Sequence, residues 1–179
     1  MTSIRPITPC DIESVQQMAS DPAIAATANL PSPYPQNGAV EWHARISKGI
    51  AEGKQVVFAV THGNEFLGVM SLNAIDLEQG QCALDYWIGK PHWGQGHATK
   101  AASLAIAYAK YVLRLRSITS GCLKANPGSR RVLEKSGFIF ADAEYDYRGP
   151  FMDRFGQMKM QHCILELNAS SAQQGAQPD

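Results

Sequence analysis

The stretch WIGKPHWGQGHATKA, residues 87–101, constrains the fold more than any other part of the chain. Bulky residues typical of a strand stop near Pro91, the chain turns on Gly94 and Gly96, and an alanine-rich run follows. This order predicts a strand that enters a helix through a glycine turn. A helix N-terminus offers unpaired N–H groups and about half a unit of positive charge, and glycine lets an anion come close. The turn therefore indicates either a phosphate cradle or a plain tight turn that needs positive φ.

The remaining pattern predicts a mixed α/β fold in the order β-α-α-β-β-β-α-β-α-β-β. An HGN turn between two apolar runs is typical of an antiparallel hairpin, whereas strand–helix–strand units add parallel pairing. Apolar alternation and apolar runs predict strands at residues 3–8, 55–61, 65–75, 81–89, 117–123, 138–145 and 157–167. Apolar residues at helical spacing predict helices at residues 11–20, 39–52, 95–113 and 127–136.

Capping residues help to define the ends of two of these helices. Asp11 and Asn126 stand where an N-cap is expected, and Pro127 suits the first turn that follows Asn126. Gly137 stands at C′ of the last helix, and Phe138 can reach back to Leu133 in a Schellman ending.

Composition limits the class of protein. A chain of 179 residues with 45% hydrophobic and 18% charged residues suits one globular domain, expected at residues 1–167, with a disordered tail at 168–179. Sixteen basic residues balance sixteen acidic ones, which gives no sign of a nucleic-acid or membrane partner. Without a leader, a bilayer-spanning run or a metal-binding spacing, the four cysteines are expected as free thiols in the cytoplasm.

Two nucleotide motifs fail at the glycine turn. A P-loop needs GxxxxGK[ST], which the sequence lacks. A dinucleotide fingerprint needs a third glycine or alanine and an acidic residue about 20 positions later. Thr99 takes the third glycine position, and the later region reads RLRSITS. These departures argue against a nicotinamide-dependent oxidoreductase.

The turn and a second stretch, NPGSRRVLEKSGF at residues 126–138, together resemble the GNAT superfamily of acetyl-CoA-dependent N-acetyltransferases. Gly96 and Ala98 match the last fixed positions of its pyrophosphate loop, whereas Trp93 replaces the usual Gln or Arg. With Trp at this position the chain resembles the RimJ/RimL branch, whose members acetylate the N-termini of ribosomal proteins. The branch pattern is met by Tyr86, Trp87, Ile88, Trp93, Gly94, Gln95, Gly96, His97, Ala98, Thr99, Ala101, Asn126, Ser129, Val132, Leu133, Glu134, Lys135, Gly137 and Phe138.

The resemblance, which spans about residues 3–167, implies a fold, a cosubstrate and a reaction. The fold is a mixed, mostly antiparallel sheet of about seven strands with helices on both faces. Acetyl-CoA is the cosubstrate and no metal is needed; residues 83–88 would pair with the pantetheine amides. An amine would attack the thioester directly in a ternary complex. Residues implied in acetyl-CoA binding are Trp87, Ile88, Trp93, Gly94, Gln95, Gly96, His97, Ala98, Thr99, Asn126, Ser129 and Arg130.

The catalytic residues implied are Ser129, Asn126 and Glu144. Ser129 is the candidate donor to the leaving thiolate, although a serine in a first helical turn also serves simply to satisfy backbone N–H groups. Asn126 is an N-cap candidate that can also contact CoA or water. Many GNAT enzymes use a tyrosine as the general acid at the position before a Glu-Lys pair. In this sequence the pair is Glu134 and Lys135, and Leu133 takes the position of the tyrosine.

Glu144 matches the glutamate of the RimL-like pattern and is the candidate base, with Asp142, Asp85 and Asp146 as rivals. A carboxylate with the usual pKa of about 4.3 is a weak base. It can take a proton more easily from a protein N-terminal amine, with a pKa of about 7.7–8.0, than from a lysine, with a pKa of about 10.4.

The acceptor stays open among a protein N-terminus, a polyamine, an aminoglycoside-like drug and a small amine metabolite. Two loops are expected to flank it, and their aromatic residues either line the acceptor groove or anchor the loops. These are Tyr34, Trp42, Tyr145, Tyr147 and Phe151. A homodimer is one option for the assembly. The alternative function from another class is a CoA-binding module without catalysis, which would keep the glycine turn and need no base.

Overall fold

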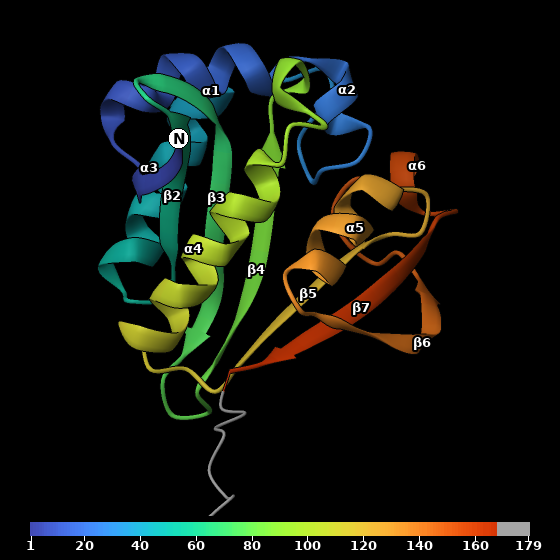
Figure 1. Ribbon diagram of the computed structural model, residues 1–179. Coiled ribbons are helices and arrows are strands. Elements are labelled where there is room, and N and C mark those ends of the chain that lie inside the picture. The colour runs from blue at the N-terminus through green and yellow to red at the C-terminus, as the bar shows by residue number, and fades with distance from the viewer. Residues whose placement is uncertain (168–179) are drawn as a thin grey trace, which may run out of the picture.

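A seven-stranded mixed sheet forms the centre of the computed structural model, which describes residues 1–167 (Figure 1). The tail predicted for residues 168–179 lies outside the described residues. The strand order is β1-β2-β3-β4-β5-β7-β6, and only the β4–β5 pair is parallel. The strands are β1 (Thr2–Pro6), β2 (Val56–His62), β3 (Glu65–Asp76), β4 (Gln81–Ile88), β5 (Ser117–Leu123), β6 (Ile139–Asp146) and β7 (Lys159–Glu166).

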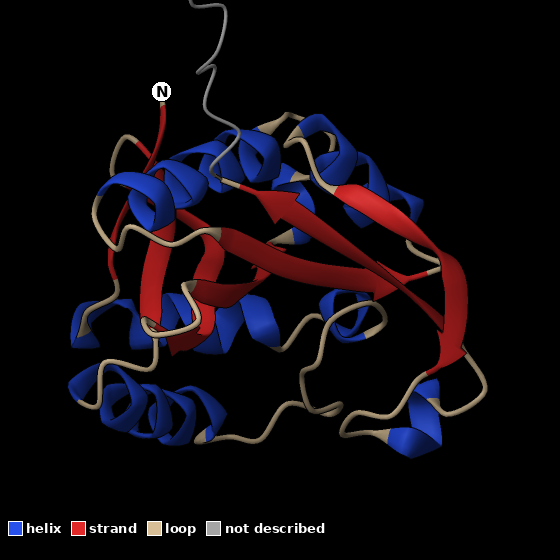
Figure 2. Cartoon of the chain, turned by 90° about the horizontal axis from the view of Figure 1, so that it is seen from below, coloured by secondary structure: helices blue, strands red, loops and turns tan. Residues whose placement is uncertain are grey.

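Helices cover both faces of the sheet (Figure 2). One face carries α4 (His97–Tyr111) and α5 (Pro127–Lys135), and the other carries α1 (Ile12–Ala19) and α3 (Gly38–Ala51). The predicted order of strands and longer helices is confirmed. One-turn elements are added: η1 (Pro9–Asp11), α2 (Pro22–Ala25), η2 (Lys90–His92) and α6 (Met152–Phe155). Segments this short carry no readable periodicity, so the sequence did not predict them.

The core lies in two layers because alternate strand residues point to opposite faces. Phe58 and Val60 of β2 pack on the α4 side, whereas Val57 and Ala59 pack on the α1 and α3 side. Alanines bring α4 close to the sheet, and four of them are fully buried: Ala101, Ala102, Ala105 and Ala109. The helix predicted to run to residue 113 ends at Tyr111, and Val112 just beyond this end is 59% exposed.

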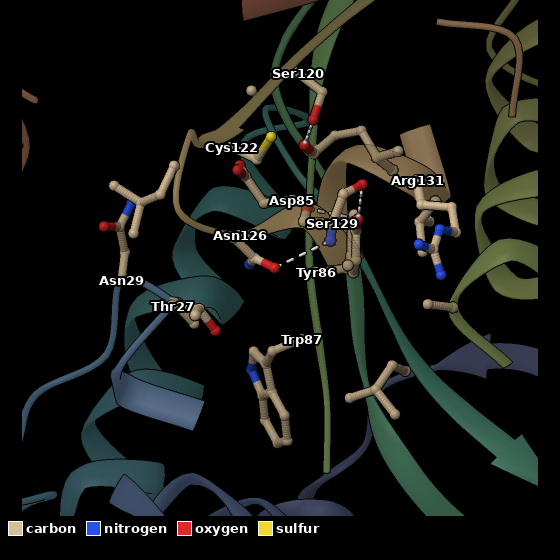
Figure 3. A pocket seen from close by; sticks show the side chains of 18 of the residues that line it. Thr27, Asn29, Asp85, Tyr86, Trp87, Ser120, Cys122, Asn126, Ser129 and Arg131 are labelled. Atoms are coloured by element: carbon tan, nitrogen blue, oxygen red, sulfur yellow. Dashed lines mark hydrogen bonds between the residues drawn. The ribbon is translucent and has the colours of Figure 1, made fainter. Parts of the chain in front are cut away.

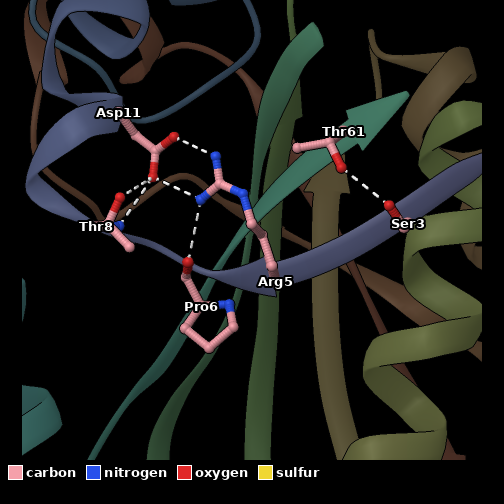
Figure 4. A network of polar contacts seen from close by, with 6 residues as sticks. All are labelled: Ser3, Arg5, Pro6, Thr8, Asp11 and Thr61. Atoms are coloured by element: carbon pink, nitrogen blue, oxygen red, sulfur yellow. Dashed lines mark hydrogen bonds and ion pairs between the residues drawn. The ribbon is translucent and has the colours of Figure 1, made fainter. Parts of the chain in front are cut away.

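The expected cap at Asp11 is replaced by an ion pair (Figure 4). Asp11 occupies the N-cap position of α1, but its side chain makes no capping hydrogen bond. Its carboxylate instead accepts from both terminal nitrogens of Arg5, at 2.8 and 2.6 Å, and from the backbone N–H of Thr8 at 2.8 Å. These bonds lower the pKa of Asp11 and tie the end of β1 to the start of α1.

Both predicted ends of α5 are confirmed. The Asn126 side chain accepts from the N–H of Ser129 at 3.1 Å. Gly137 has φ +92°, and the N–H of Phe138 donates to the Leu133 carbonyl at 3.1 Å, as in a Schellman ending. The cysteines are free, and Cys82, Cys122 and Cys163 are buried while Cys10 is exposed. Within the described residues, no helix has both the length and the apolar character to cross a membrane.

The sheet opens between its two central strands. The β4–β5 ladder contains the pairs Gln81–Ser117, Cys82–Ile118 and Ala83–Thr119, and β4 then continues to Ile88 with no strand paired on that edge. One side-chain bond follows the last pair, from the Ser120 hydroxyl to the Leu84 carbonyl at 2.8 Å. Figure 1 shows β5 and β7 diverging from β4 at this point. The opening lies beside the glycine turn and the start of α5.

Candidate active site

A cavity of about 750 Å³ occupies the opening between β4 and β5. Leu84, Tyr86 and Ile88 pack toward the α4 layer, so the alternating Asp85 and Trp87 face the other layer. Residues of both groups line the cavity. The cavity therefore passes through the sheet and is reached from both faces.

Most of the site residues predicted from the sequence meet in this cavity. The lining includes Trp87, Ile88, Trp93, Gly94, Gly96, His97, Ala98, Thr99, Asn126 and Ser129. Gln95, Arg130 and Glu144 are not among the lining residues. The cavity thus brings together the strand, the glycine turn and the start of α5, which are distant in sequence.

The glycine turn exposes backbone to the cavity. Gly94 has φ +74° and Gly96 has φ +81°, conformations that side chains rarely adopt. A Cβ built on either glycine would meet no other atom within 4 Å, so open space lies beside both. Gly96 is the N-cap of α4, and no side chain caps that helix. The first N–H groups of α4 are therefore available to an anion.

Two residues of the same motif hold the turn in place. The indole Nε1 of Trp93 donates to the Ile88 carbonyl at 2.6 Å, which ties the turn to the end of β4. The Gln95 Nε2 donates to the Pro91 carbonyl at 3.0 Å, so this side chain supports the turn from outside the cavity. Trp93 replaces the usual Gln or Arg and is 46% exposed, so it fixes the loop and also presents part of its ring at the cavity.

His97, the first residue of α4, lies in a group of histidines. Its Nδ1 is 2.8 Å from the Thr2 hydroxyl, and its ring lies 5.4 Å from that of His62 and 6.3 Å from that of His92. Burial lowers the pKa of His97, and the two neighbouring histidines lower it further. His97 is thus held neutral beside the turn.

Ser129 projects from the first turn of α5 toward β4 (Figure 3). Its hydroxyl lies 2.8 Å from the Tyr86 hydroxyl, and either oxygen can be the donor in that pair. The Tyr86 hydroxyl also lies 3.3 Å from the Ser129 carbonyl. The Asn126 side chain accepts from the Ser129 N–H, so it is an N-cap and also lines the cavity. Tyr86 was not predicted as a site residue, because the sequence does not reveal which helix meets that face of the strand.

Arg130 turns away from the cavity, and Arg131 lines it instead. The Arg130 guanidinium pairs with Glu134 at 2.8 Å and lies 4.4 Å from the centre of the Phe140 ring. Arg131 and Lys135, one turn apart on α5, line the cavity. Figure 3 shows Arg131 on one side of the central strand and Thr27 and Asn29 on the other.

Glu144 is held by Lys124 at 2.9 Å and receives a hydrogen bond from Gln161 at 3.3 Å. The hydrogen bond from Lys124 lowers the pKa of Glu144 below its usual range. Its rival Asp85 lines the cavity and accepts from the Asn73 amide at 2.7 Å.

Two loops from distant parts of the chain close the face opposite α4 and α5. Thr27 and Asn29 follow α2, and Tyr147 and Phe155 come from the segment after β6. The Tyr147 hydroxyl donates to Asn29 Oδ1 at 2.8 Å and joins the two loops.

Of the five aromatic residues considered for the acceptor groove, Tyr147 lines the cavity. The others pack elsewhere: Tyr34 and Trp42 against the α1 and α3 core, Phe151 beside Phe155 and Tyr147, and Tyr145 on His162.

Comparison with known proteins identifies the family. Residues 2–139 match the family described as "Acetyltransferase (GNAT) domain". The chain belongs to the GNAT acetyltransferase family. The match covers β1 through the start of β6 and includes the glycine turn and α5.

The chain is similar to three curated proteins. It is 40% identical over 76 residues to the probable N-acetyltransferase YjcK of Bacillus subtilis (strain 168), covering 42% of each chain. It is 28% identical over 130 residues to the uncharacterized N-acetyltransferase p20 of Bacillus licheniformis, covering 72% of this chain and 73% of p20. It is 30% identical over 87 residues to the ribosomal-protein-serine acetyltransferase of Escherichia coli (strain K12), covering 49% of each. The chain thus spans less than half of two of these relatives.

Solved structures share the fold. The spermidine N-acetyltransferase of Vibrio cholerae, in complex with CoA and spermine, has a TM-score of 0.79 and 17% identity, over 93% of this chain and 95% of that chain. A chimera of the same enzyme has a TM-score of 0.78 with the same identity and coverage. The mixed sheet flanked by helices, expected from the sequence, is therefore confirmed as the GNAT fold.

Proposed function

We propose that the protein transfers the acetyl group of acetyl-CoA to a primary amine. The observation that carries the proposal is the cavity through the sheet, which joins an uncapped helix N-terminus on one face to a carboxylate and aromatic side chains on the other. Two substrates can then meet within the opening between β4 and β5. Direct attack in a ternary complex needs this arrangement, because donor and acceptor must be present together.

The α4 side suits acetyl-CoA. The N–H groups at Gly96 and the first turn of α4 would bind the pyrophosphate, since no Cβ stands in the way. The edge of β4 beyond Ala83, with which no strand pairs, would bond the pantetheine amides as a neighbouring strand would. Its Leu84 and Ile88 carbonyls already accept from Ser120 and Trp93. Arg131 and Lys135 are the basic side chains of α5 placed to bind a further phosphate. Bound in this way, acetyl-CoA supplies the thioester whose carbonyl carbon accepts the amine.

The start of α5 would serve the leaving group. Ser129 lies in the first helical turn, where the helix dipole favours negative charge, and its hydroxyl can donate to a thiolate. Asn126 holds the Ser129 backbone through its cap. We assign both residues the roles that the family resemblance implies.

The proton of the attacking amine needs an acceptor, and two carboxylates are candidates. Glu144 stays the prediction from the family resemblance, and its ion pair with Lys124 and its lowered pKa make it a weak base. Asp85 lines the cavity on the face of Trp87. We expect Asp85→Asn to lower kcat more than Glu144→Gln does. A larger loss in Glu144→Gln would return the role to Glu144.

The cavity charge favours an acceptor with one ammonium group. Within the described residues, Asp85 is the only carboxylate that lines the cavity, alongside Arg131 and Lys135. A polyamine carries further ammonium groups, which need further carboxylates. Apolar lining by Ile24, Phe155 and Met160 suits a single amine on a neutral body. A protein N-terminus of the RimJ/RimL kind, or a small monoamine, fits this better than spermidine, the acceptor named for the Vibrio cholerae neighbour.

Release of free thiol from acetyl-CoA tests the function directly. The panel contains peptides with a free N-terminus, the same peptides with a blocked N-terminus, spermidine and an aminoglycoside. We expect kcat/KM for a free N-terminus or a small monoamine to exceed that for spermidine at least tenfold. Faster acetylation of spermidine would refute the charge argument. CoA binding without release for any amine would instead favour a non-catalytic CoA-binding module.

A further inference from the structure

Tyr86 brings a phenol to the residue proposed to serve the leaving thiolate. It lies on β4, 43 residues before Ser129, and the two hydroxyls are 2.8 Å apart (Figure 3). The phenol oxygen also lies 3.3 Å from the Ser129 carbonyl, a longer contact that competes for its single hydrogen. Tyr86 thus contacts both the side chain and the backbone of Ser129 and fixes the first turn of α5 against the strand.

The phenol keeps its proton. Tyr86 packs against the core of the α4 layer, and burial raises its pKa far above the usual range. The hydrogen bond with Ser129 opposes this rise to a smaller extent. Tyr86 is therefore a hydrogen-bond donor at neutral pH and does not become a phenolate.

A donated bond from Tyr86 frees the hydrogen of Ser129. A serine hydroxyl has one hydrogen and two lone pairs, so it can accept from Tyr86 while donating elsewhere. When an anion lies on the cavity side, this direction is favoured because each bond in the chain polarises the next.

Leu133 cannot provide the missing hydroxyl from α5. The family resemblance implies a tyrosine that acts as the general acid at this position. The Leu133 side chain found here is fully buried in the core and does not line the cavity. A phenol reaches this end of the cavity from β4 instead. The hydroxyl group is thus supplied by Tyr86 of β4, because Leu133 of α5 has none.

We propose that Tyr86 is a positioning residue that holds the Ser129 hydroxyl as a donor to the departing CoA sulfur. The inference rests on the proposed function. The amine nitrogen bonds to the acetyl carbon, the carbon–sulfur bond breaks, and its electron pair stays on sulfur. Ser129 stabilises that charge, the sulfur gains the proton equivalent to the one lost by the amine, and both hydroxyls end as they began.

A double-mutant cycle on turnover tests the coupling. Tyr86→Phe keeps the ring in the core, and we expect kcat to fall about tenfold while KM for acetyl-CoA stays within about twofold. Ser129→Ala should lower kcat at least as much. The double variant should be no slower than Ser129→Ala, because Tyr86 acts through Ser129. Multiplied losses would overturn the inference.

Tyr108→Phe is the matched control. Tyr108 lies on α4 with its ring 5.3 Å from that of Phe58, and it does not line the cavity. Its kcat should equal that of the parent protein. Equal losses in Tyr86→Phe and Tyr108→Phe would assign the effect to packing and overturn the inference.

Binding gives a readout independent of turnover. The affinity for CoA is compared with that for desulfo-CoA as pH rises through the thiol pKa, about 8.5 for a cysteine thiol. A donor to the thiolate makes CoA gain affinity relative to desulfo-CoA at high pH, and Tyr86→Phe and Ser129→Ala should both lose this gain. An unchanged gain of affinity in the two variants would overturn this inference and leave the proposed function standing. A gain without turnover for any amine would overturn the proposed function and leave the donor pair supported.

Discussion

Two helices begin at the same cavity, and their first turns differ in what satisfies the backbone. At α4 the N-cap is Gly96, with φ +81° and no capping side chain. At α5 the N-cap is Asn126, whose side chain accepts from the Ser129 N–H at 3.1 Å. At α4 no side chain bonds the first N–H groups, whereas at α5 the cap satisfies the N–H of Ser129.

Under the proposed function, this difference would let one cavity bind a large anion at one helix and carry out chemistry at the other. Free N–H groups and a bare turn favour a phosphate at α4. The capped start of α5 has a fixed geometry and presents a hydroxyl in a defined place. We expect α4 to govern cosubstrate affinity and α5 to govern turnover.

A carboxylate at the bare turn should have the largest effect. Gly96→Asp places negative charge where the pyrophosphate is proposed to bind, and acetyl-CoA affinity should fall about 100-fold. Calorimetric titration with CoA measures this loss. Gly53→Asp is the control, because Gly53 has φ +68° and open space for a Cβ but lies at the end of α3. Similar losses in both variants would make strain the cause and remove the distinction between the helices.

Removing the cap of α5 should have an intermediate effect. Asn126→Ala loses the hydrogen bond to the Ser129 N–H, and the free energy of unfolding should fall by about 1 kcal/mol. Turnover should fall more than CoA affinity, since Ser129 is then less well held. Urea unfolding and steady-state kinetics measure the two effects. Asn37→Ala tests the same substitution at the N-cap of α3, where no side-chain bond is made, and should leave stability almost unchanged.

Acid should act weakly, through the first residue of α4. Burial lowers the pKa of His97, so folding favours its neutral form. Its stabilising contribution is complete above the unfolded pKa of about 6.5 and declines as the pH falls below that value.

Urea midpoints at about pH 7.5 and about pH 5.5 measure the contribution of His97, and His97→Gln should lose less stability on acidification than the parent protein. Added CoA should also reduce the loss, because the pyrophosphate favours a protonated His97. The first residue of α5 is Pro127, which corresponds in position to His97 of α4. Proline has no side chain that titrates, so that position adds no pH dependence of this kind. Equal acid sensitivity in the parent and in His97→Gln would assign the effect to other groups.

Local signals predicted much of the fold. The hairpin at HGN, the cap at Asn126 and the ending at Gly137 depend on neighbouring residues, and all three are confirmed. Asp11 departs from its expected role because Arg5, on another element, reaches its carboxylate. A propensity for capping is weak against a two-bonded ion pair.

Most of the predicted site residues in the two motifs line the cavity, whereas Gln95 and Arg130 of the motifs and Glu144 outside them do not. Arg130 and Arg131 are adjacent in sequence, and helix geometry directs only Arg131 into the cavity. The choice between Asp85 and Glu144 depends on where the strands diverge, and strand divergence leaves no mark in composition or spacing.

The sequence by itself determined the order of strands and helices, the glycine turn and the family that they indicate, because backbone conformation and capping act over a few residues. Tertiary structure alone decided that the sheet opens after Ala83, that the opening passes to both faces, and that Tyr86 meets Ser129. These features depend on contacts between residues far apart in the chain, and such contacts exist only once the layers have packed.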